Sequence, residues 1–181
     1  MCLGRLVGFE SWLERDEAMA LDFDPLIEAF AAQPFQLEWV DHTGDCKHTP
    51  DFFARRTDGV CVVVDCRPEN RMEERDQQLF DGTARICAML GWEFRLVHGH
   101  DPIWLANVGW LAGYRLARFR IEPIAADLLR ELAEPRPLAW AAAEVGDPIA
   151  VLPVAYHLLW RGELRADMTE RLDGLSVVKA A

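Results

Sequence analysis

The sequence of 181 residues has no long hydrophobic run, no low-complexity tract and no excess of basic residues. Charged residues interrupt the apolar stretches within about a dozen residues, whereas crossing a bilayer takes about 20 consecutive apolar residues. The N-terminal segment lacks the basic start, sustained apolar core and cleavage site of a signal peptide. These absences predict a globular cytoplasmic protein without a membrane segment.

The scarcity of positive charge argues against autonomous DNA binding. The net charge is −11, and Asp and Glu outnumber Lys and Arg by 20 to 13 in residues 1–121 and by 10 to 6 in residues 122–181. Nucleic-acid binders usually gain affinity by neutralising phosphates with Lys and Arg. This chain would therefore need a partner or a local arginine cluster to bind DNA. The densest basic cluster, Arg115, Arg118 and Arg120, fits either a DNA-facing edge or a solvated helix end.

The number of cysteines is odd, and most of them lie in apolar surroundings: Cys2, Cys46, Cys61, Cys66 and Cys87. Reduced, buried thiols are the expected state. Cys61 and Cys66 would point to opposite faces of a strand, which argues against a zinc knuckle.

The order of hydrophobic patterns and caps predicts an α/β fold over residues 1–121, a mixed sheet flanked by helices. Its expected helices are residues 11–20, 24–32, 69–90 and 101–116, and its expected strands are 35–41, 52–56, 60–64 and 92–97, with a polar turn at 42–47. Ser11, Asp24-Pro25 and Asp101-Pro102 are the expected starts of the first, second and fourth helices, and Gly91 is the expected C-cap of the third. Residues 122–181 are expected to form a second, small module of three helices (124–133, 137–145 and 147–161) and a hairpin within 163–179, with Gly146-Asp147-Pro148 as the cap between the last two helices. That combination is typical of a winged-helix-like module.

The segment 48–68 predicts a β-hairpin with chemistry at one end. Thr57-Asp58-Gly59 separates two runs rich in aromatic and β-branched residues, a strong hairpin signal. Side chains alternate along a strand, so Asp65 and Arg67 share a face. Pairing of the two strands can bring Asp51, Asp65 and Arg67 together at one end of the sheet.

Two carboxylates and a cation suit a divalent metal and a phosphate. Carboxylates bind Mg²⁺, the metal lowers the pKa of an attacking water, and a nearby cation stabilises charge on phosphate oxygens. Glu14, on the first helix, is the candidate third acid. Simpler structural roles also exist: Glu14 as the capping partner of Ser11, Asp51 as a turn residue, and Asp65 with Arg67 as a plain ion pair.

Two histidines and three tryptophans have simpler expected roles. His48 is expected to support the site or a strand edge rather than bind metal, and His157 is expected to be packed. Trp104, Trp110 and Trp160 occupy apolar helix positions and are expected in the core.

Pro50-Asp51 followed by Asp65-Cys66-Arg67 resembles the PD-(D/E)xK nuclease core. The stretches SWLERDEAMALDFDP, AAQPFQLEW, HTPDFFARRTDG and VVVDCRP are together similar to the N-terminal endonuclease domain of TnsA-type heteromeric transposase subunits. The segment DPIAVLPVAYHLLWRGELRADM resembles the C-terminal winged-helix part of the same family.

This resemblance implies a restriction-endonuclease-like fold and Mg²⁺- or Mn²⁺-dependent cutting of DNA at a transposon end. The implied partners are an integrase-type transposase and an AAA+ ATPase regulator. Glu14, Asp51 and Asp65 match the acidic metal-site positions, and the family has Glu or Gln where this chain has Asp65. Arg67 matches the position of the family's lysine.

Arg67 departs from the family pattern in a way that bears on chemistry. Arginine is not deprotonated in proteins and cannot act as a general base, although it can bind a phosphate. Two alternatives to an active transposition nuclease therefore stay open. One is a catalytically impaired subunit that serves DNA docking or assembly, and the other is a nuclease of the same fold used in defence or plasmid maintenance.

Overall fold

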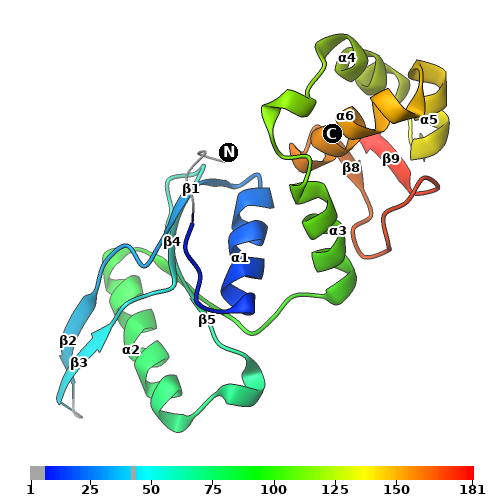
Figure 1. The fold of residues 1–181 in the computed structure, drawn as a ribbon. Helices are drawn as coiled ribbons and strands as arrows, with labels where there is room; N and C mark the ends of the chain where they lie inside the picture. The colour runs from blue at the N-terminus through cyan, green and yellow to red at the C-terminus, as the bar shows by residue number, and fades with distance from the viewer. Residues whose placement is uncertain (1–6, 42–43) are drawn as a thin grey trace. The chain divides into compact units, whose positions relative to one another are not determined.

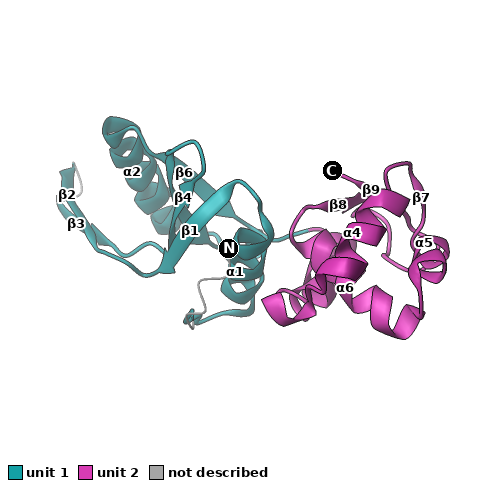
Figure 2. Cartoon of the chain, turned by 90° about the horizontal axis from the view of Figure 1, so that it is seen from above, with its two compact units in different colours: residues 1, 3–100 teal, residues 2, 101–181 magenta. Residues whose placement is uncertain are grey.

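The computed structural model describes residues 7–41 and 44–181, which divide into two compact units between His100 and Asp101 (Figures 1 and 2). The sequence predicted this division after residue 121. The difference arises because helix α3 (Pro102–Ala112) contacts helix α6 (Pro148–Trp160) of the second unit. Four of the five cysteines lie in the described part, all as free thiols, and of these only Cys87 is buried.

The first unit has the mixed sheet flanked by helices that its sequence predicts. Its elements are α1 (Trp12–Phe23), β1 (Ile27–Ala32), β2 (Leu37–Asp41), β3 (Gly44–His48), β4 (Phe52–Arg56), β5 (Cys61–Cys66), η1 (Glu69–Arg71), α2 (Glu74–Leu90) and β6 (Glu93–Val97). The main sheet has the order β1-β4-β5-β6, in which β4 is antiparallel to both neighbours and β5 is parallel to β6. Strands β2 and β3 form a separate antiparallel pair.

The two faces of the main sheet are covered by different helices. On one face, Leu21 of α1 packs in a cluster with Phe52, Val62 and Val64, all essentially buried. On the other face, the rings of Phe80 (α2) and Phe94 (β6) lie 6.1 Å apart. Burial on both sides explains why β5 reads as a nearly continuous apolar run rather than an alternating one.

The segment predicted as a second helix, residues 24–32, is instead strand β1. Helix α1 continues to Phe23, and the Asp24 side chain accepts a hydrogen bond from the Leu26 backbone in a turn, not at a helix start. The next six residues pair antiparallel with β4, with a bulge between Ile27 and Ala29. An Asp-Pro step fits both a helix cap and a turn, and pairing with β4 decided between them.

The other boundaries differ less from those predicted. Part of the turn expected at residues 42–47 is strand β3, which starts at Gly44; His42 and Thr43 lie outside the described residues. The helix expected from residue 69 opens with the 3-10 turn η1, and α2 begins at Glu74. Its C-cap is Gly91, as predicted, with a left-handed φ of 71°.

Glycine is required at one helical position, Gly82 in α2, because the Trp39 ring of β2 lies against it. A Cβ added there would lie 2.6 Å from Cζ2 of Trp39. We expect Gly82→Ala to lower the free energy of unfolding by about 1–3 kcal/mol through overpacking, although alanine favours helices. Gly109→Ala in α3 is the matched control, since a Cβ there meets nothing within 4 Å. It should be neutral or stabilising in urea denaturation followed by circular dichroism, and equal effects of the two changes would contradict the contact.

The second unit consists of helices packed with a small antiparallel sheet. After α3 come η2 (Ala117–Phe119), α4 (Glu122–Glu131), β7 (Arg136–Pro137), α5 (Leu138–Val145), α6, β8 (Leu164–Ala166) and β9 (Val177–Ala180), with sheet order β7-β9-β8. Asp101 and Asp147 cap α3 and α6, each followed by proline at the first helical position, as predicted. No helix among the described residues is long and apolar enough to span a membrane.

One buried side chain binds three backbone groups in the long connection between β8 and β9. Asn107 of α3 donates to the carbonyl oxygens of Met168 and Glu170 and accepts from the Leu172 backbone, at 3.1, 2.8 and 2.9 Å. A single amide thus satisfies three backbone groups of a loop without regular structure, which orders that loop.

Candidate functional site

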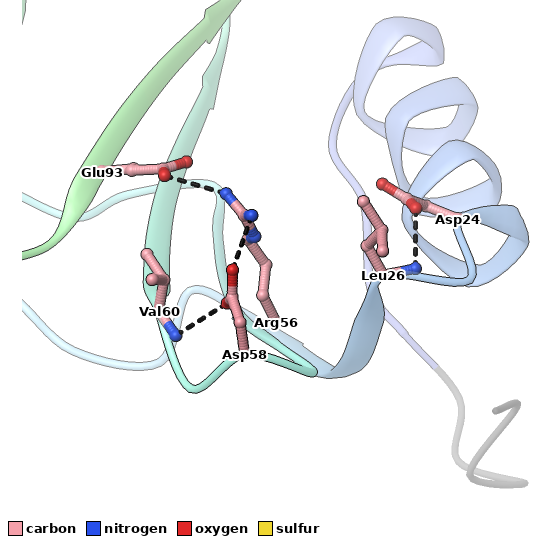
Figure 3. A network of polar contacts seen from close by, with 6 residues as sticks. All are labelled: Asp24, Leu26, Arg56, Asp58, Val60 and Glu93. Atoms are coloured by element: carbon pink, nitrogen blue, oxygen red, sulfur yellow. Dashed lines mark hydrogen bonds and ion pairs between the residues drawn. The ribbon is translucent and has the colours of Figure 1, made fainter.

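The central hairpin, β4–β5, is anchored at its turn. Gly59 takes a positive φ of 86° in the three-residue loop 57–59, where an L side chain would be strained. Asp58 accepts from the Val60 backbone and pairs with Arg56, which also reaches Glu93 at the start of β6 (Figure 3). These contacts tie the turn to the neighbouring strand and so help to fix the strand register.

The register places the two predicted acids of the hairpin beside each other at its open end. Phe52 pairs with Val64, and one step further Asp51 faces Asp65. The Asp51 backbone donates to Oδ1 of Asp65 at 3.2 Å, and the Cys66 backbone donates to Oδ2 of Asp51 at 2.7 Å. Asp51 and Asp65 therefore converge as the sequence predicted. A slip of one residue would move Asp65 to the other face and destroy the arrangement.

Asp65 is held by a histidine from the β2–β3 pair. Its side chain is buried, and Nε2 of His48 lies 2.8 Å from its Oδ2. The His48 ring in turn packs edge-on against Phe80 of α2. Through this hydrogen bond His48 orients the Asp65 carboxylate, a supporting role of the kind that the sequence predicted for it.

Asp51 carries the most perturbed carboxyl of the hairpin. Burial, with the charges of Asp65 and Glu14, raises its pKa from 3.8 to about 6, and the Cys66 N–H and His48 oppose the rise. The carboxylates of Asp65 and Glu14 thus both repel that of Asp51, and a bound cation would relieve this repulsion.

Glu14 belongs to α1, which covers the face of the sheet opposite to the one where His48 meets Asp65. Cys66 packs on the face that α1 covers, while Asp65, its neighbour on β5, meets His48 on the face of α2. Glu14 is half-buried, lies next to the N-cap Ser11, and accepts from the Glu10 backbone at 2.7 Å. It influences Asp51 electrostatically, but no contact joins it to Asp51 or Asp65 among the interactions of the described residues.

Arg67 does not join the acids of the hairpin. Its Nε and Nη2 lie 2.9 and 2.7 Å from Oδ2 of Asp76, near the start of α2. Arg67 shares the Asp65 face, as predicted, but it is engaged with a different carboxylate. A plain ion pair between Asp65 and Arg67 is absent from the described structure.

A buried carboxylate on α1, Glu17, was not among the site residues predicted from the sequence. It is 1% exposed, its Oε2 lies 3.0 Å from Nε2 of His100, and its Oε1 lies 3.9 Å from Nη1 of Arg95. Burial raises its pKa to about 7, partly offset by Arg95. Burial, opposed by Asp16, lowers the pKa of His100. The signal in the sequence was the i, i+3 spacing of Glu14 and Glu17, which places both on one helix face.

The carboxylates at the open end of the hairpin are of the type that binds a hard divalent cation. Mg²⁺ prefers oxygen ligands and is commonly bound through one or two carboxylates, with waters completing its shell. Asp51 and Asp65 supply two such groups on adjacent strands. Within residues 7–41 and 44–181, however, no three His, Cys, Asp or Glu side chains are grouped as metal ligands. The structure therefore brings Asp51 and Asp65 into contact, whereas Glu14 acts on Asp51 only through its charge.

Comparison of the sequence with protein-family models and with curated proteins found no match.

Proposed function

We propose that this chain is a metal-dependent DNA endonuclease subunit of a heteromeric transposase, acting with an integrase-type transposase and an AAA+ ATPase. The observation that carries the proposal is the junction of Asp51 and Asp65 at the end of the hairpin, with Glu14 acting on the same position. The strand order β1-β4-β5-β6, with α2 joining parallel strands β5 and β6, supports a restriction-endonuclease-like fold for the first unit. Helices α4–α6 with the β7-β9-β8 sheet support a winged-helix-like second unit.

In this proposal Asp51 and Asp65 hold Mg²⁺ or Mn²⁺, with Glu14 as the third acid. The bound metal would supply Lewis acidity at the phosphate and lower the pKa of a water ligand. Within the chain, His48 holds Asp65 in place and the Cys66 N–H holds Asp51. Asp51 accepts a metal only when ionised, so its raised pKa makes metal binding dependent on pH near 6.

One observation favours the alternative of a catalytically impaired subunit that serves DNA docking or assembly. Arg67 stands where the resemblance places a lysine, and its guanidinium is paired with Asp76 rather than free at the site. General acid–base catalysis contributes about 10²–10⁴-fold, so losing a proton acceptor there would weaken cutting severely.

The test of the proposal combines cleavage with metal binding. The purified protein, alone and with its transposase partner, is incubated with supercoiled plasmid and Mg²⁺ or Mn²⁺, while calorimetry measures metal binding. Nicking together with metal binding is expected. Metal binding without nicking would select the impaired alternative, and the absence of both with every partner would reject the metal site.

Restoring lysine tests the role of Arg67 directly. We expect Arg67→Lys to increase nicking by about 10²-fold, because lysine shifts its pKa readily and can take a proton, whereas arginine cannot. Initial nicking rates across pH 6–9, roughly the range in which a perturbed lysine titrates, provide the measurement.

Arg71→Lys is the matched control, since Arg71 is exposed in the adjacent η1 turn. Asp76→Asn adds a second comparison, because it frees Arg67 without changing its chemistry. Equal rates for Arg67→Lys and the parent protein would show that the guanidinium is not what limits activity.

A further inference from the structure

The second unit carries an aromatic cluster that the proposed nuclease chemistry does not use. Tyr114 lies at its centre, with ring centroids 4.9 Å from Tyr156, 5.2 Å from Phe119 and 5.9 Å from Trp110. The cluster brings together α3, η2 and α6. Trp110 was expected in the core, but it is 56% exposed. The cluster therefore has a half-buried centre and presents an indole to solvent.

Two arginines border this cluster without a carboxylate partner. Arg118 lies 5.0 Å from the Phe119 ring centroid, and Arg115 donates to the carbonyl oxygen of Ala112 at the end of α3. Both are exposed, and neither forms an ion pair with the described residues. Arg120, the third member of the basic cluster seen in the sequence, differs because it is paired with Glu122 and Glu163.

Two further arginines of the unit are paired with carboxylates. Arg130 is paired with Asp127, and Arg136 with Glu131. The second unit has 11 Asp and Glu against 9 Lys and Arg, so partners for a cation are plentiful. Arg161, Arg165 and Arg171 of this unit also form no ion pair among the described residues, but of the arginines without one, Arg118 is the one that lies over an aromatic ring of the cluster.

We propose that Trp110, Arg115 and Arg118 form a binding site for single-stranded nucleic acid. An exposed indole offers a π-face to any base, and unpaired arginines offer charge to the phosphates on either side. Tyr114 and Tyr156 support the indole from behind, which limits the entropy lost when a base stacks on it. The site deepens the proposed function, because cutting at a DNA end would present such a strand, and it rests on that function for its biological context.

We infer a nucleic-acid strand rather than an acidic peptide as the ligand, because this surface offers an aromatic ring for stacking as well as positive charge. Asp173 contributes to raising the pKa of Tyr156, so a carboxylate lies near one edge of the cluster. The carboxylate repels any anion there, phosphate or peptide alike, but an acidic peptide without aromatic groups would also gain nothing from Trp110. A base stacked on Trp110 gains about 1–3 kcal/mol, a term that needs no further positive charge.

Binding is measured by fluorescence anisotropy with the full chain, a labelled oligothymidine of about 20 nucleotides and no divalent metal. Trp110→Ala is expected to weaken binding about 10-fold, by loss of one stacked base. The double variant Arg115→Gln/Arg118→Gln is expected to reduce the slope of log affinity against log salt by about 1.4, the value for two phosphate contacts on a single strand.

Two changes in the same unit serve as controls. Trp140 on α5 is 61% exposed, so Trp140→Ala matches the loss of an exposed indole. Arg130→Gln matches the loss of a charge. Both should bind as the parent protein does, with unchanged circular dichroism in all variants.

The proposal is overturned if the parent protein does not bind the oligonucleotide, or if Trp110→Ala and Trp140→Ala bind equally well. Binding of duplex with no dependence on Trp110 would also overturn it, by showing contact with the backbone alone. Because no metal is present, failure of the nuclease proposal would leave these measurements unaffected.

Discussion

Asp51→Asn is expected to reduce metal-dependent nicking by about 10³-fold, the largest effect of any single change in the proposed site. Asparagine keeps an oxygen that accepts from the Cys66 N–H but removes the negative charge that would bind the metal. Lewis-acid stabilisation is worth several kcal/mol, and each 1.36 kcal/mol corresponds to about tenfold in rate. Plasmid nicking and calorimetric metal binding should fall together.

The raised pKa of Asp51 adds a pH dependence with a definite sign. A folded pKa of about 6 means that the carboxyl is protonated at pH 5 and ionised at pH 7. Metal affinity should therefore rise as pH increases through about 6. In Asp51→Asn this dependence should disappear.

Asp58→Asn is the control, because Asp58 lies at the other end of the same hairpin and pairs with Arg56 (Figure 3). It should leave nicking and metal affinity unchanged. Nicking that survives Asp51→Asn would remove Asp51 from the site, whatever happens at Asp58.

Glu17→Gln is expected to stabilise the protein at alkaline pH by about 3 kcal/mol. Burial raises the folded pKa of Glu17 from 4.5 to about 7, so the folded state prefers the neutral acid. At pH 4 the carboxyl is neutral in both states and imposes no penalty. As pH rises from about 4.5 to 7 the folded state binds more protons than the unfolded state, and stability falls by about 1.36 kcal/mol per pKa unit.

The glutamine variant lacks this titration, so the difference in unfolding free energy between the two proteins should grow from near zero at pH 4 to its full value at pH 8. His100 titrates with the opposite sign, since its pKa is lowered. Urea denaturation at several pH values gives the difference directly.

Glu28→Gln provides the comparison for Glu17, because Glu28 is exposed and paired with Arg55 on the next strand. It should change stability by less than about 1 kcal/mol at any pH. A Glu17→Gln protein whose stability relative to the parent did not vary with pH would show that Glu17 is ionised without penalty.

Short sequence patterns predicted the structure correctly where each fits a single conformation. Ser11 and Gly91 cap helices as the sequence predicted. Thr57-Asp58-Gly59 turns the hairpin, and the resulting register brings Asp51 to Asp65. In each case neighbouring backbone groups decide the conformation, so the information lies within a few residues.

Where a short sequence pattern fits two conformations, contacts with residues distant in the sequence decided between them. Asp24-Pro25 fits a helix start, but the residues after it pair with β4. An apolar helix position predicts a buried tryptophan, but packing placed Trp160 inside and left Trp110 exposed. Burial depends on which elements meet, and periodicity alone does not specify that.

The sequence by itself determined the mixed α/β class of the first unit, its central hairpin and the face shared by Asp65 and Arg67. Strand periodicity and turn chemistry are local properties, and they suffice for these features. Only the tertiary structure decided the partners of those side chains: His48 for Asp65, Asp76 for Arg67, and a buried Glu17 beside His100. These pairs join residues from different elements, and their distances depend on how helices pack on the sheet.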